Sequence, residues 1–523
     1  MHLTDLVSDT TTLADAHTDA PATVAIDITG LAVDSRRVVA GDLFFALEGS
    51  HADGRDYADA AIKSGAGAIV TDMRPLEGVL ADVPIPVLQT EKPRAVLAAA
   101  AARFWPRQPG LTAAVTGTNG KTSTVEFLRQ IWQRTTWDAV SIGTLGMQGI
   151  ESRDMQGTMM GLAALTTPDA ISLHGALNKL AGAGITHMAI EASSHGIEQC
   201  RLDGLNVHIA GFTNLSRDHL DHHPDMEAYF AAKSRLFTTL LMAGGTAVIN
   251  IDDDYGARLA KMLRGPAKRD IVVLTIGETK GADFHIKAIT PMDFGLEITV
   301  AHGSATMRIP VALAGRFQAL NAITAAVMAH ASGLPLHDSL GALAYVTGAE
   351  GRMQLVTGHP AGARVIIDYA HTPDALHAAL TALRPEARGR LAVLFGAGGD
   401  RDPGKRPMMG KTAADLADLV YVTDDNPRSE APEAIRRDIL VGCPNAQEIN
   451  DRAEAITKAL AGLTADDVLL IAGKGHENFQ LVGDETLPFS DASVARKAII
   501  DMTAATSAAV SYTHLRAHET HND

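Results

Sequence analysis

The segment Leu111–Arg134 holds the feature that most constrains how this chain can fold, a glycine-rich turn between an apolar run and a helical pattern. The run Leu111–Val115 is short and apolar, as in a buried strand. Helical spacing after the turn puts Val125, Leu128 and Trp132 on one side of a helix. The turn consists of Gly117, Thr118, Asn119, Gly120, Lys121 and Thr122. This order of strand, turn and helix is typical of a phosphate-binding loop.

The residue types of this turn suit the binding of a nucleoside triphosphate. Glycines allow backbone N–H groups to converge on phosphate oxygens, and the start of the helix adds a positive dipole end. Lys121 supplies a charge for the terminal phosphates, and the Thr122 hydroxyl can coordinate Mg²⁺. The widest form of the pattern has glycine where this chain has Val115. An ordinary glycine-rich turn is the alternative, but the complete core of the motif in this context predicts nucleotide binding.

Length and composition exclude several classes of protein. At 523 residues the chain predicts about three to four domains. A net charge of −16 argues against non-specific binding to nucleic acid, which requires a basic face. Two cysteines, Cys200 and Cys443, cannot form a disulfide framework, so we expect a cytoplasmic protein. We expect no membrane insertion, because no run of about 18 apolar residues occurs and the N-terminus does not have the order of a signal peptide.

The first hundred residues predict a separate domain that ends near Pro109. Strands are expected at Leu43–Leu47, Ala66–Thr71 and Ile85–Leu88. Two polar patches accompany them, Val33–Arg37 and Glu48–Arg55, and the second contains glycine and suits contact with a ligand. Taken alone, both patches are typical of surface loops.

The second region places polar residues at the start of a predicted helix and at the end of a further strand. Thr167 can cap a helix whose first residue is Pro168, with Asp169 in the first turn. The strand Thr186–Ile190 ends on Glu191, where a carboxylate downstream of a phosphate loop can provide a second contact to Mg²⁺. The alternative is an acidic residue in a turn.

A cluster of histidine and aspartate follows the predicted strand Val207–Phe212, at residues 218–223. Its spacing matches no zinc site, so one or two of these groups serving nucleotide-bound Mg²⁺ is the better interpretation. The segment Tyr229–Phe237 has a helical pattern that includes Lys233. A lone lysine on a helix is usually a solvated charge, and the pattern predicts nothing more for Lys233.

The third region repeats an apolar strand, a polar loop and a helix. The strands are expected at Val365–Ile367, Leu391–Phe395, Leu419–Val422 and Val468–Ile471. This alternation predicts a parallel sheet with all four loops at one edge. Arg401 and Arg428 are suited to carboxylates and Glu477 to an ammonium group, so an amino acid is the expected ligand, with surface ion pairs as the alternative. The loop at Gly396 does not fit a dinucleotide-binding pattern.

Several of these motifs together resemble the Mur ligase family, over about Val33 to Asp491. The motifs that carry the resemblance are Asp34–Arg36, Gly117–Thr122, Glu191–Gly196, Asn214–Leu215, Asp218–His219, Lys233, Asn321, Asp425–Arg428 and Gly473–Glu477. The resemblance implies an α/β fold of three domains: a UDP-sugar-binding domain (1–109), a central phosphate-loop ATPase domain (110–348) and a C-terminal Rossmann-like domain with a parallel sheet (349–510). It also implies ATP-dependent amide-bond formation through an acyl phosphate, in peptidoglycan biosynthesis.

The resemblance assigns expected roles to residues of this chain. Catalytic roles are implied for Lys121, Glu191, His219 and Lys233. Metal contacts to Mg²⁺ are implied for Thr122, Glu191, His219 and Lys233, the lysine being carbamoylated. ATP contacts are implied for Gly117, Thr118, Asn119, Gly120, Lys121, Thr122, Asn321, Arg352 and Asp368. Contacts to the UDP-sugar peptide are implied for Val33, Ser35, Ser50, His51, Ala52, Thr166, Thr167, Ser193, Gln199 and Arg201. Contacts to the amino acid are implied for Arg401, Asp425, Asn426, Pro427, Arg428, Gly473 and Glu477.

Within the family, the motifs resemble the members that add meso-diaminopimelate to UDP-N-acetylmuramoyl-L-alanyl-D-glutamate, and we expect a monomer. Lysine-adding members are the alternative, and Arg428 favours diaminopimelate because that substrate has a second carboxylate. A folylpolyglutamate synthetase would share the ATPase core but not the Asp34–Arg36 region. A small-molecule kinase or a nucleotide-binding regulator would leave the loops of the third region unexplained. The segment Ser511–Asp523 has no counterpart in the family, and we expect it to be a non-native tail.

Overall fold

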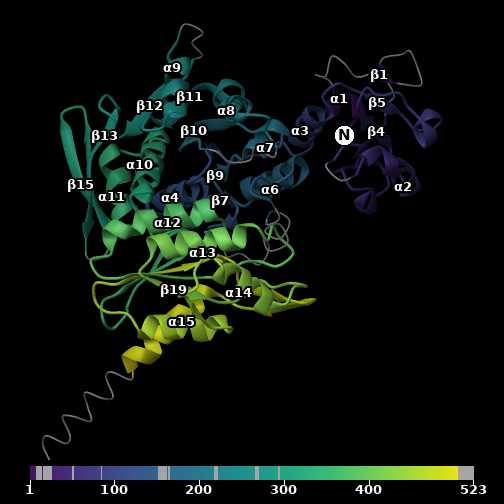
Figure 1. Cartoon of the computed structure of the whole chain (residues 1–523). Helices are drawn as coiled ribbons and strands as arrows, with labels where there is room; N and C mark the ends of the chain where they lie inside the picture. The colour runs from purple at the N-terminus through teal and green to yellow at the C-terminus, as the bar shows by residue number, and fades with distance from the viewer. Residues whose placement is uncertain are drawn as a thin grey trace, which may run out of the picture. The chain divides into compact units, whose positions relative to one another are not determined.

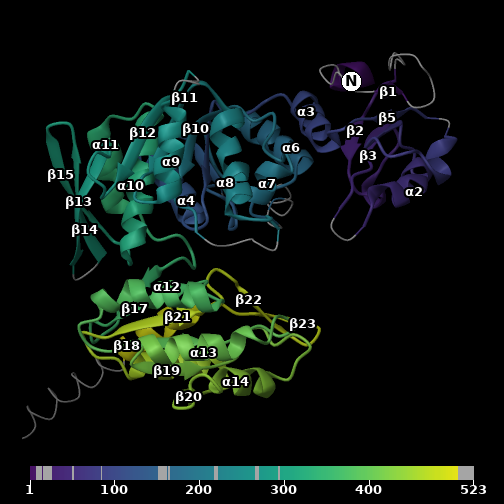
Figure 2. The same cartoon turned by 45° about the horizontal axis from the view of Figure 1, so that its top comes forward.

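The computed structural model describes most of the chain, in two compact units (Figures 1 and 2). The described residues are 1–7, 14–15, 26–49, 52–83, 85–150, 162, 165–216, 222–265, 270–292 and 295–504. One unit contains Met1–Phe284 and Thr324–Ser339, and the other contains His285–Ile323 and the chain from Leu340 onward. The predictions for Ser50, His51, His219 and Ser511–Asp523 concern residues outside the described ranges.

The N-terminal part of the first unit is a five-stranded sheet. Its strands are β1 (Ala14–Asp15), β2 (Gly30–Ala32), β3 (Asp42–Phe45), β4 (Ala68–Thr71) and β5 (Val87–Gln89), in the order β1-β5-β4-β3-β2. Only β1 is antiparallel to its neighbour. The helices are α1 (Leu3–Val7), α2 (Ala58–Lys63) and α3 (Pro93–Phe104). The three strands expected from the sequence are confirmed, with ends shifted by at most two residues.

The rest of the first unit is built around β6, the strand that leads into the glycine-rich turn. The strands are β6 (Leu111–Thr116), β7 (Ala139–Gly143), β8 (Gly146–Gln148), β9 (His187–Glu191), β10 (Val207–Phe212), β11 (Leu241–Asn250) and β12 (Val272–Gly277), in the order β12-β11-β10-β6-β9-β7-β8. All neighbours are parallel except β7 and β8. The helices include α4 (Lys121–Arg134), α6 (Ala170–Gly182), α7 (Ser194–Glu198), α8 (Met226–Arg235) and α9 (Asp254–Leu263). The turn after β6 therefore lies at the carboxyl edge of a parallel sheet, where ligands bind in such folds.

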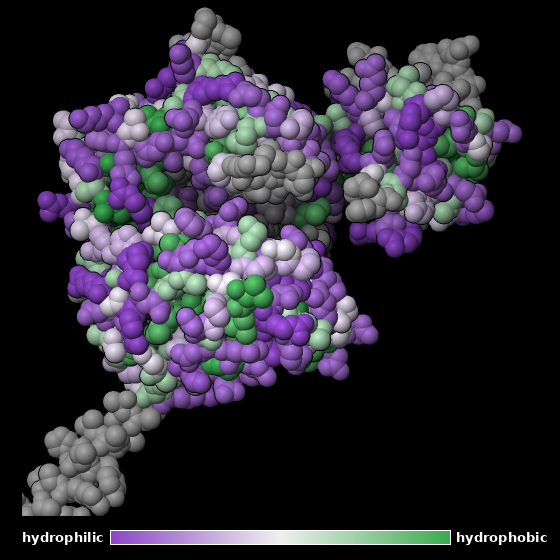
Figure 3. Space-filling view, viewed as in Figure 1, coloured by the Kyte–Doolittle hydropathy of each residue, from purple (hydrophilic) through white to green (hydrophobic). Residues whose placement is uncertain are grey.

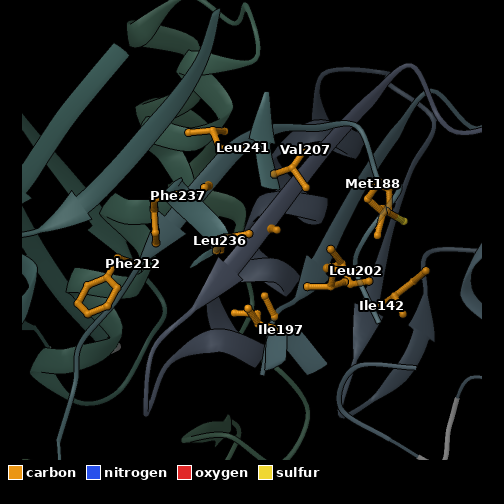
Figure 4. Close-up of a cluster of buried hydrophobic side chains, with 14 of the residues drawn as sticks. Ile142, Met188, Ile197, Leu202, Val207, Phe212, Leu236, Phe237 and Leu241 are labelled. Carbon is orange, nitrogen blue, oxygen red and sulfur yellow. The ribbon is translucent and has the colours of Figure 1, made fainter. Parts of the chain in front are cut away.

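Apolar side chains from the strands and the surrounding helices form one core in this part of the unit. Figure 4 draws 14 of these side chains and labels nine, which come from β7, β9, β10, α7 and the segments around them. Val125, Leu128 and Trp132 are buried, as their helical spacing predicts. The Trp132 indole N–H donates to Ser332 Oγ at 2.9 Å, which satisfies its polar atom inside the core. The core fixes β6 and α4, and with them the turn between.

The second unit begins with three antiparallel strands and ends with a six-stranded sheet. The first group is β13 (Phe284–Met292), β14 (Gly295–His302) and β15 (Ala305–Val311). The helices α10 (Arg316–Ala331) and α11 (Leu336–Gly341) come next and have residues in both units, and a short 3₁₀ turn (Ala342–Tyr345) follows them. The sheet contains β16 (Gln354–Val356), β17 (Arg364–Asp368), β18 (Leu391–Phe395), β19 (Leu419–Val422), β20 (Gln447–Glu448) and β21 (Val468–Ala472), in the order β16-β17-β21-β18-β19-β20. Only β16 runs antiparallel to its neighbour, so the predicted parallel sheet is confirmed.

Helices cover both faces of this sheet, as Figure 1 shows. One face packs against α12 (Pro373–Leu383), α13 (Lys405–Leu416) and α14 (Pro432–Leu440). The other packs against α15 (Arg452–Ala461) and the helical residues 491–504. A hairpin of β22 (Phe479–Val482) and β23 (Glu485–Pro488) follows β21. The four predicted loops thus gather at the carboxyl edge of the sheet.

Figure 3 shows hydrophilic residues over most of the visible face of both units, with hydrophobic residues scattered among them. Within the described ranges, no helix is both long and apolar enough to cross a membrane.

One predicted helix start is wrong. Thr167 does not cap the helix, because its hydroxyl accepts from the Ser193 N–H at 3.0 Å and donates to the Glu191 carbonyl oxygen at 2.8 Å. Asp169 is the cap instead, and its carboxylate accepts from the Ser172 N–H at 2.9 Å. Both residue types are good caps, so a contact to a distant strand decided between them.

The ion pair of Arg452 and Asp491 joins the ends of three elements in the second unit, and both side chains are fully buried. Arg452 also donates to the carbonyl oxygen of Ala472, at the end of β21. We expect Arg452→Met to destabilise this unit by about 3–5 kcal/mol, because it leaves Asp491 buried without its cation. Hydrogen exchange of β21 and of residues 491–504 measures the loss directly.

The matched control is Lys497→Met, which removes a partner of an exposed pair with Asp501. This control should change stability by less than about 1 kcal/mol. Equal protection of β21 in Arg452→Met and in the unaltered protein would contradict the role of the buried pair.

Candidate functional site

The phosphate loop holds its backbone open at the start of α4. Gly120 precedes the helix in a left-handed conformation (φ 89°) and has no side chain to cap it. The first N–H groups of a helix have no acceptor inside it, so they are available to an anion. Asn214 braces the loop from the end of β10: its Oδ1 accepts from the Asn119 N–H, and its Nδ2 donates to the Asn119 carbonyl, both at 3.0 Å.

Lys121 places a positive charge at this loop, and Gly117 allows the loop to pack closely against its neighbours. The Lys121 ammonium donates to the carbonyl oxygens of Gly117 and Thr118 at 2.9 and 2.8 Å, which holds the charge over the loop. Gly117 has φ 152°, and a Cβ there would lie 1.9 Å from Thr213 Oγ1. Only glycine fits at this position.

Lys233 lies inside the protein, so its interpretation as a solvated charge is wrong. Its side chain is 1 % exposed, and its ammonium donates to the Gly117 carbonyl oxygen at 2.8 Å. The same nitrogen lies 4.5 Å from the centre of the Tyr229 ring, and the Tyr229 hydroxyl lies 3.3 Å from Thr118 Oγ1. Helix α8 therefore presents Tyr229 and Lys233 to the phosphate loop, a placement that depends on how α8 packs and not on helical spacing.

Glu191 is a buried carboxylate beside the phosphate loop, since it pairs in register with Val115 across β6 and β9. Its Oε1 accepts from the Thr144 N–H at 2.7 Å, and its Oε2 accepts from Thr144 Oγ1 at 3.3 Å. A Cβ on Gly143 would lie 2.1 Å from Oε1, so a glycine there makes room for the carboxylate.

The oxygens of Glu191 and Thr122 are hard donors of the kind that Mg²⁺ prefers, and they fit that ion. Within the described ranges, no group of three or more His, Cys, Asp and Glu side chains is arranged to hold a metal. His219, the further metal contact that the resemblance implies, lies outside those ranges.

Five residues predicted to contact a peptide substrate form one network next to Glu191. Thr167 Oγ1 lies 3.0 Å from Ser193 Oγ, and Arg201 donates to the Thr167 carbonyl at 2.8 Å. Arg201 also donates to Gln199 Oε1 at 2.7 Å. Thr166 Oγ1 joins through Thr144 Oγ1 at 3.2 Å. Burial lowers the pKa of Arg201, which nevertheless stays protonated, so the network presents a cation.

The N-terminal candidates Val33, Ser35 and Ala52 lie in turns of the first sheet. Val33 is exposed and Ser35 is buried, and Ala52 accepts a hydrogen bond from the Gly49 N–H at 2.9 Å. Beside them, hydrogen bonds from Arg36 lower the pKa of Asp34 to about 2. Within the described ranges, no hydrogen bond joins Ala52 to Val33 or Ser35.

In the second unit, Asp368 is the last residue of β17, and Arg352 lies close to it. Burial raises the pKa of Asp368, and the nearby Arg352 opposes this effect. The Arg352 guanidinium lies 4.7 Å from the centre of the Tyr369 ring. The Arg352 backbone carbonyl accepts from the Gln318 side chain at 3.0 Å. Asn321 donates to Gln318 Oε1 at 2.9 Å, so α10 and this edge form one polar network.

His476 completes this network from the loop after β21. Its ring centre lies 5.1 Å from that of Tyr369. Burial, assisted by the charge of Arg352, lowers the pKa of His476 to about 4. The ring is therefore neutral at physiological pH and can take part in hydrogen bonds as donor or acceptor.

The candidate amino-acid site lies farther along the same edge. The Asn426 side chain donates to Glu477 Oε2 at 2.8 Å, and Arg428 donates to the Gly399 carbonyl oxygen at 2.8 Å. Arg428 has φ 52°, and Asp400, next to Arg401, has φ 54°. Such strain in residues other than glycine is common at functional sites.

Close packing between these loops explains two of their glycines. A Cβ on Gly399 would lie 1.9 Å from the Pro427 carbonyl oxygen. A Cβ on Gly473, which has φ 112°, would lie 2.6 Å from Asp425 Oδ2. The structure thus brings Asp425 to Gly473 and Pro427 to Gly399, as expected for loops at one sheet edge. Among the described residues, no hydrogen bond or ion pair joins Arg401 to Glu477.

Sequence reasoning missed two buried polar residues of these sites, Tyr229 and Lys474. Lys474 is fully buried and donates to Asn426 Oδ1 at 3.0 Å and to Glu477 Oε2 at 3.2 Å. The signal that could have found Lys474 is its position between two glycines, directly after a buried strand. Tyr229 has no comparable local signal.

Comparison with known protein families covers most of the chain. Residues 27–105 match the description "Mur ligase family, catalytic domain", residues 115–329 match "Mur ligase middle domain", and residues 351–475 match "Mur ligase, glutamate ligase domain".

Two curated relatives illustrate the similarity. The UDP-N-acetylmuramoyl-L-alanyl-D-glutamate–2,6-diaminopimelate ligase of Bradyrhizobium diazoefficiens is 49 % identical over 471 residues, 90 % of this chain and 94 % of the relative. The protein of the same name from Rhizobium meliloti is 45 % identical over 500 residues, 95 % of this chain and 99 % of the relative.

Solved structures agree in fold. A structure of a protein with this same name has a TM-score of 0.67 and 33 % identity, and covers 91 % of this chain and 95 % of its own. The folylpolyglutamate synthase of Mycobacterium tuberculosis, solved with ADP, has a TM-score of 0.57 and 18 % identity over 72 % of this chain and 91 % of its own. The second likeness concerns the fold alone.

We expect Gly117→Ala to weaken the binding of a non-hydrolysable ATP analogue by at least about tenfold, because the new methyl group would overlap Thr213 and displace the loop. Isothermal titration calorimetry measures the affinity. The matched control is Gly184→Ala, which also introduces a Cβ at positive φ (87°) but meets nothing within 4 Å. Equal affinities of the two variants would contradict the steric requirement at Gly117.

Proposed function

Because this chain belongs to the Mur ligase family, we propose that it adds meso-2,6-diaminopimelate to UDP-N-acetylmuramoyl-L-alanyl-D-glutamate in peptidoglycan biosynthesis, converting ATP to ADP and phosphate. The observation that carries the choice of amino acid is the loop at the sheet edge of the second unit. There Arg428 supplies a guanidinium and Glu477 a carboxylate, the two groups that an amino acid requires. The relatives named for this reaction support the same choice.

We assign the three domains as the resemblance implies. Residues 1–109 bind the UDP-sugar, residues 110–348 bind ATP, and residues 349–510 bind the incoming amino acid. The proposed UDP-sugar and peptide contacts are Val33, Ser35, Ser50, His51, Ala52, Thr166, Thr167, Ser193, Gln199 and Arg201. The network of Thr167, Ser193 and Arg201 beside Glu191 supports the placement of the peptide near the phosphate loop.

The first step is an attack by a carboxylate oxygen of the D-glutamate on the γ-phosphorus of ATP. A bond forms from that oxygen to the γ-phosphorus, and the bond between the γ-phosphorus and the β-phosphate oxygen breaks. ADP departs, and the peptide carboxylate has become an acyl phosphate. Phosphoryl transfer of this kind depends on positioning and charge neutralisation. Lys121 and the N–H groups of α4 neutralise the phosphates, while Gly117–Thr122 position them. Asn321, Arg352 and Asp368 provide the further contacts to ATP.

We propose Mg²⁺ as the cofactor, held by Thr122, Glu191, His219 and a carbamoylated Lys233. When bound, Mg²⁺ neutralises charge on the phosphate oxygens. Carbamoylation converts the lysine ammonium to a carbamate, whose oxygens are hard donors. The burial of Lys233 beside the Gly117 carbonyl supports this role, because it puts the modified nitrogen at the phosphate loop.

In the second step, the amine of diaminopimelate attacks the carbonyl carbon of the acyl phosphate. The tetrahedral intermediate collapses to the amide and expels phosphate, and the amine loses its proton. Arg401, Asp425, Asn426, Pro427, Arg428, Gly473 and Glu477 hold the amino acid in this proposal. Arg428 favours diaminopimelate over lysine because only diaminopimelate carries a second carboxylate. We further propose that the protein acts in the cytoplasm as a monomer.

The reaction itself provides a direct test. Phosphate release should require ATP, UDP-N-acetylmuramoyl-L-alanyl-D-glutamate and meso-diaminopimelate together, and a coupled phosphate assay measures it. Lysine should support turnover at least about tenfold less efficiently, because Arg428 would be left without its carboxylate. Equal efficiency with lysine would show that the protein is a lysine-adding ligase.

Replacement of Lys233 tests the carbamate. Lys233→Ala should nearly abolish phosphate release, and formate or acetate should restore part of it by supplying the missing carboxylate. Arg235→Ala is the control, since this neighbour pairs with Asp203 and should not respond to added carboxylate. Failure of every small carboxylic acid to restore Lys233→Ala would contradict the proposed modification.

A further inference from the structure

We propose that Lys474 is a positioning residue that holds Asn426 and Glu477 in the arrangement that receives the ammonium group of the incoming amino acid. The inference rests on the proposed function and adds to it a residue that does not itself touch the substrate. Lys474 lies between Gly473 and Gly475 in the loop after β21, and its side chain is fully buried.

The ammonium of Lys474 joins two residues of the amino-acid site. It donates to Asn426 Oδ1 at 3.0 Å and to Glu477 Oε2 at 3.2 Å. Burying a charge is costly unless it is paired and hydrogen-bonded, so the burial of Lys474 depends on both partners. Lys474 thereby links the loop after β19 to the loop after β21.

Lys474 and the Leu481 N–H together determine which way the Asn426 amide faces. The ammonium can only donate, and so can the Leu481 N–H, which lies 3.0 Å from the same Asn426 atom. The atom between two donors must be the oxygen. The amide nitrogen then faces Glu477 and donates to its Oε2 at 2.8 Å.

This arrangement leaves the two oxygens of Glu477 in different states. Oε2 accepts from both Asn426 and Lys474. Oε1 accepts no hydrogen bond within the described part of the chain, and the Glu477 side chain is 20 % exposed. One oxygen is therefore anchored and the other can accept from an ammonium group that enters from solvent.

The hairpin of β22 and β23 secures the same loop from the other side. Gln480 donates from its side chain to the Asp425 carbonyl at 2.7 Å, and the Arg428 N–H donates to the Leu481 carbonyl at 3.0 Å. Since the backbone of the loop is held by the hairpin, loss of Lys474 should disturb mainly the side chains of Asn426 and Glu477. The predicted defect is consequently specific to the amino acid.

Steady-state kinetics of Lys474→Met tests the proposal, because methionine retains the length of the side chain and removes its charge and its hydrogen bonds. We expect the KM for meso-diaminopimelate to rise about 10- to 100-fold. The KM values for ATP and for the UDP-sugar peptide should stay within about twofold. Lys411→Met is the matched control: this exposed lysine of α13 also pairs with a carboxylate, Asp415, and its loss should leave all three KM values unchanged.

A double-mutant cycle separates positioning from a general structural role. Glu477→Gln alone should raise the KM for diaminopimelate. If Lys474 acts through Glu477, adding Lys474→Met to that variant should raise the KM by less than about twofold more. Equal effects of Lys474→Met in both backgrounds would overturn the proposal, and so would an unchanged KM in Lys474→Met.

Lys474→Gln guards against misfolding of the methionine variant. Glutamine can still donate to Asn426 Oδ1 but lacks the charge, so the KM should lie between those of the unaltered protein and Lys474→Met. Binding of ADP, measured by calorimetry, should be equal in all variants, and a parallel rise in the KM for ATP would overturn the specific role. Absence of diaminopimelate-dependent turnover in the unaltered protein would instead contradict the proposed function.

Discussion

The buried contact between Lys233 Nζ and the Gly117 carbonyl oxygen connects α8 to the phosphate loop in the interior of the protein. The contact requires glycine at position 117, because a Cβ there would collide with Thr213. The same loop is braced by Asn214, so β10 and α8 hold it from two directions. The geometry offered to ATP therefore depends on packing between elements far apart in the sequence.

In the second unit, too, packing between elements far apart in the sequence determines the geometry of the proposed ligand site. Its parallel sheet collects four polar loops at one edge, and buried polar contacts then fix them to one another. Strain remains visible at Asp400 and Arg428, whose positive φ angles are held by hydrogen bonds to Ser429 and to the hairpin. Both units thus place function on loops that the surrounding scaffold determines.

The sequence was sufficient for features that local patterns encode. The turn at Gly117–Thr122 and the strands that precede the polar loops combine apolar runs with glycine, and the structure has them where they were predicted. Lys233 was not predictable from helical spacing, because its burial depends on how α8 meets the phosphate loop. Thr167 and Asp169 were equally good caps locally, and a hydrogen bond to Glu191, on another strand, decided between them. The resemblance to a family, and not the pattern of residues, supplied the roles of Lys233 and His219.

The central claim is that the peptide carboxylate is activated by forming a bond to the γ-phosphorus of ATP, and isotope transfer tests it most directly. The carboxylates of the D-glutamate in the UDP-sugar peptide are labelled with ¹⁸O, and the released phosphate is analysed by mass spectrometry after turnover with meso-diaminopimelate. An acyl phosphate requires each released phosphate to carry one labelled oxygen, because the bridging oxygen leaves with phosphorus. Amide formation without ¹⁸O in the phosphate would contradict the mechanism.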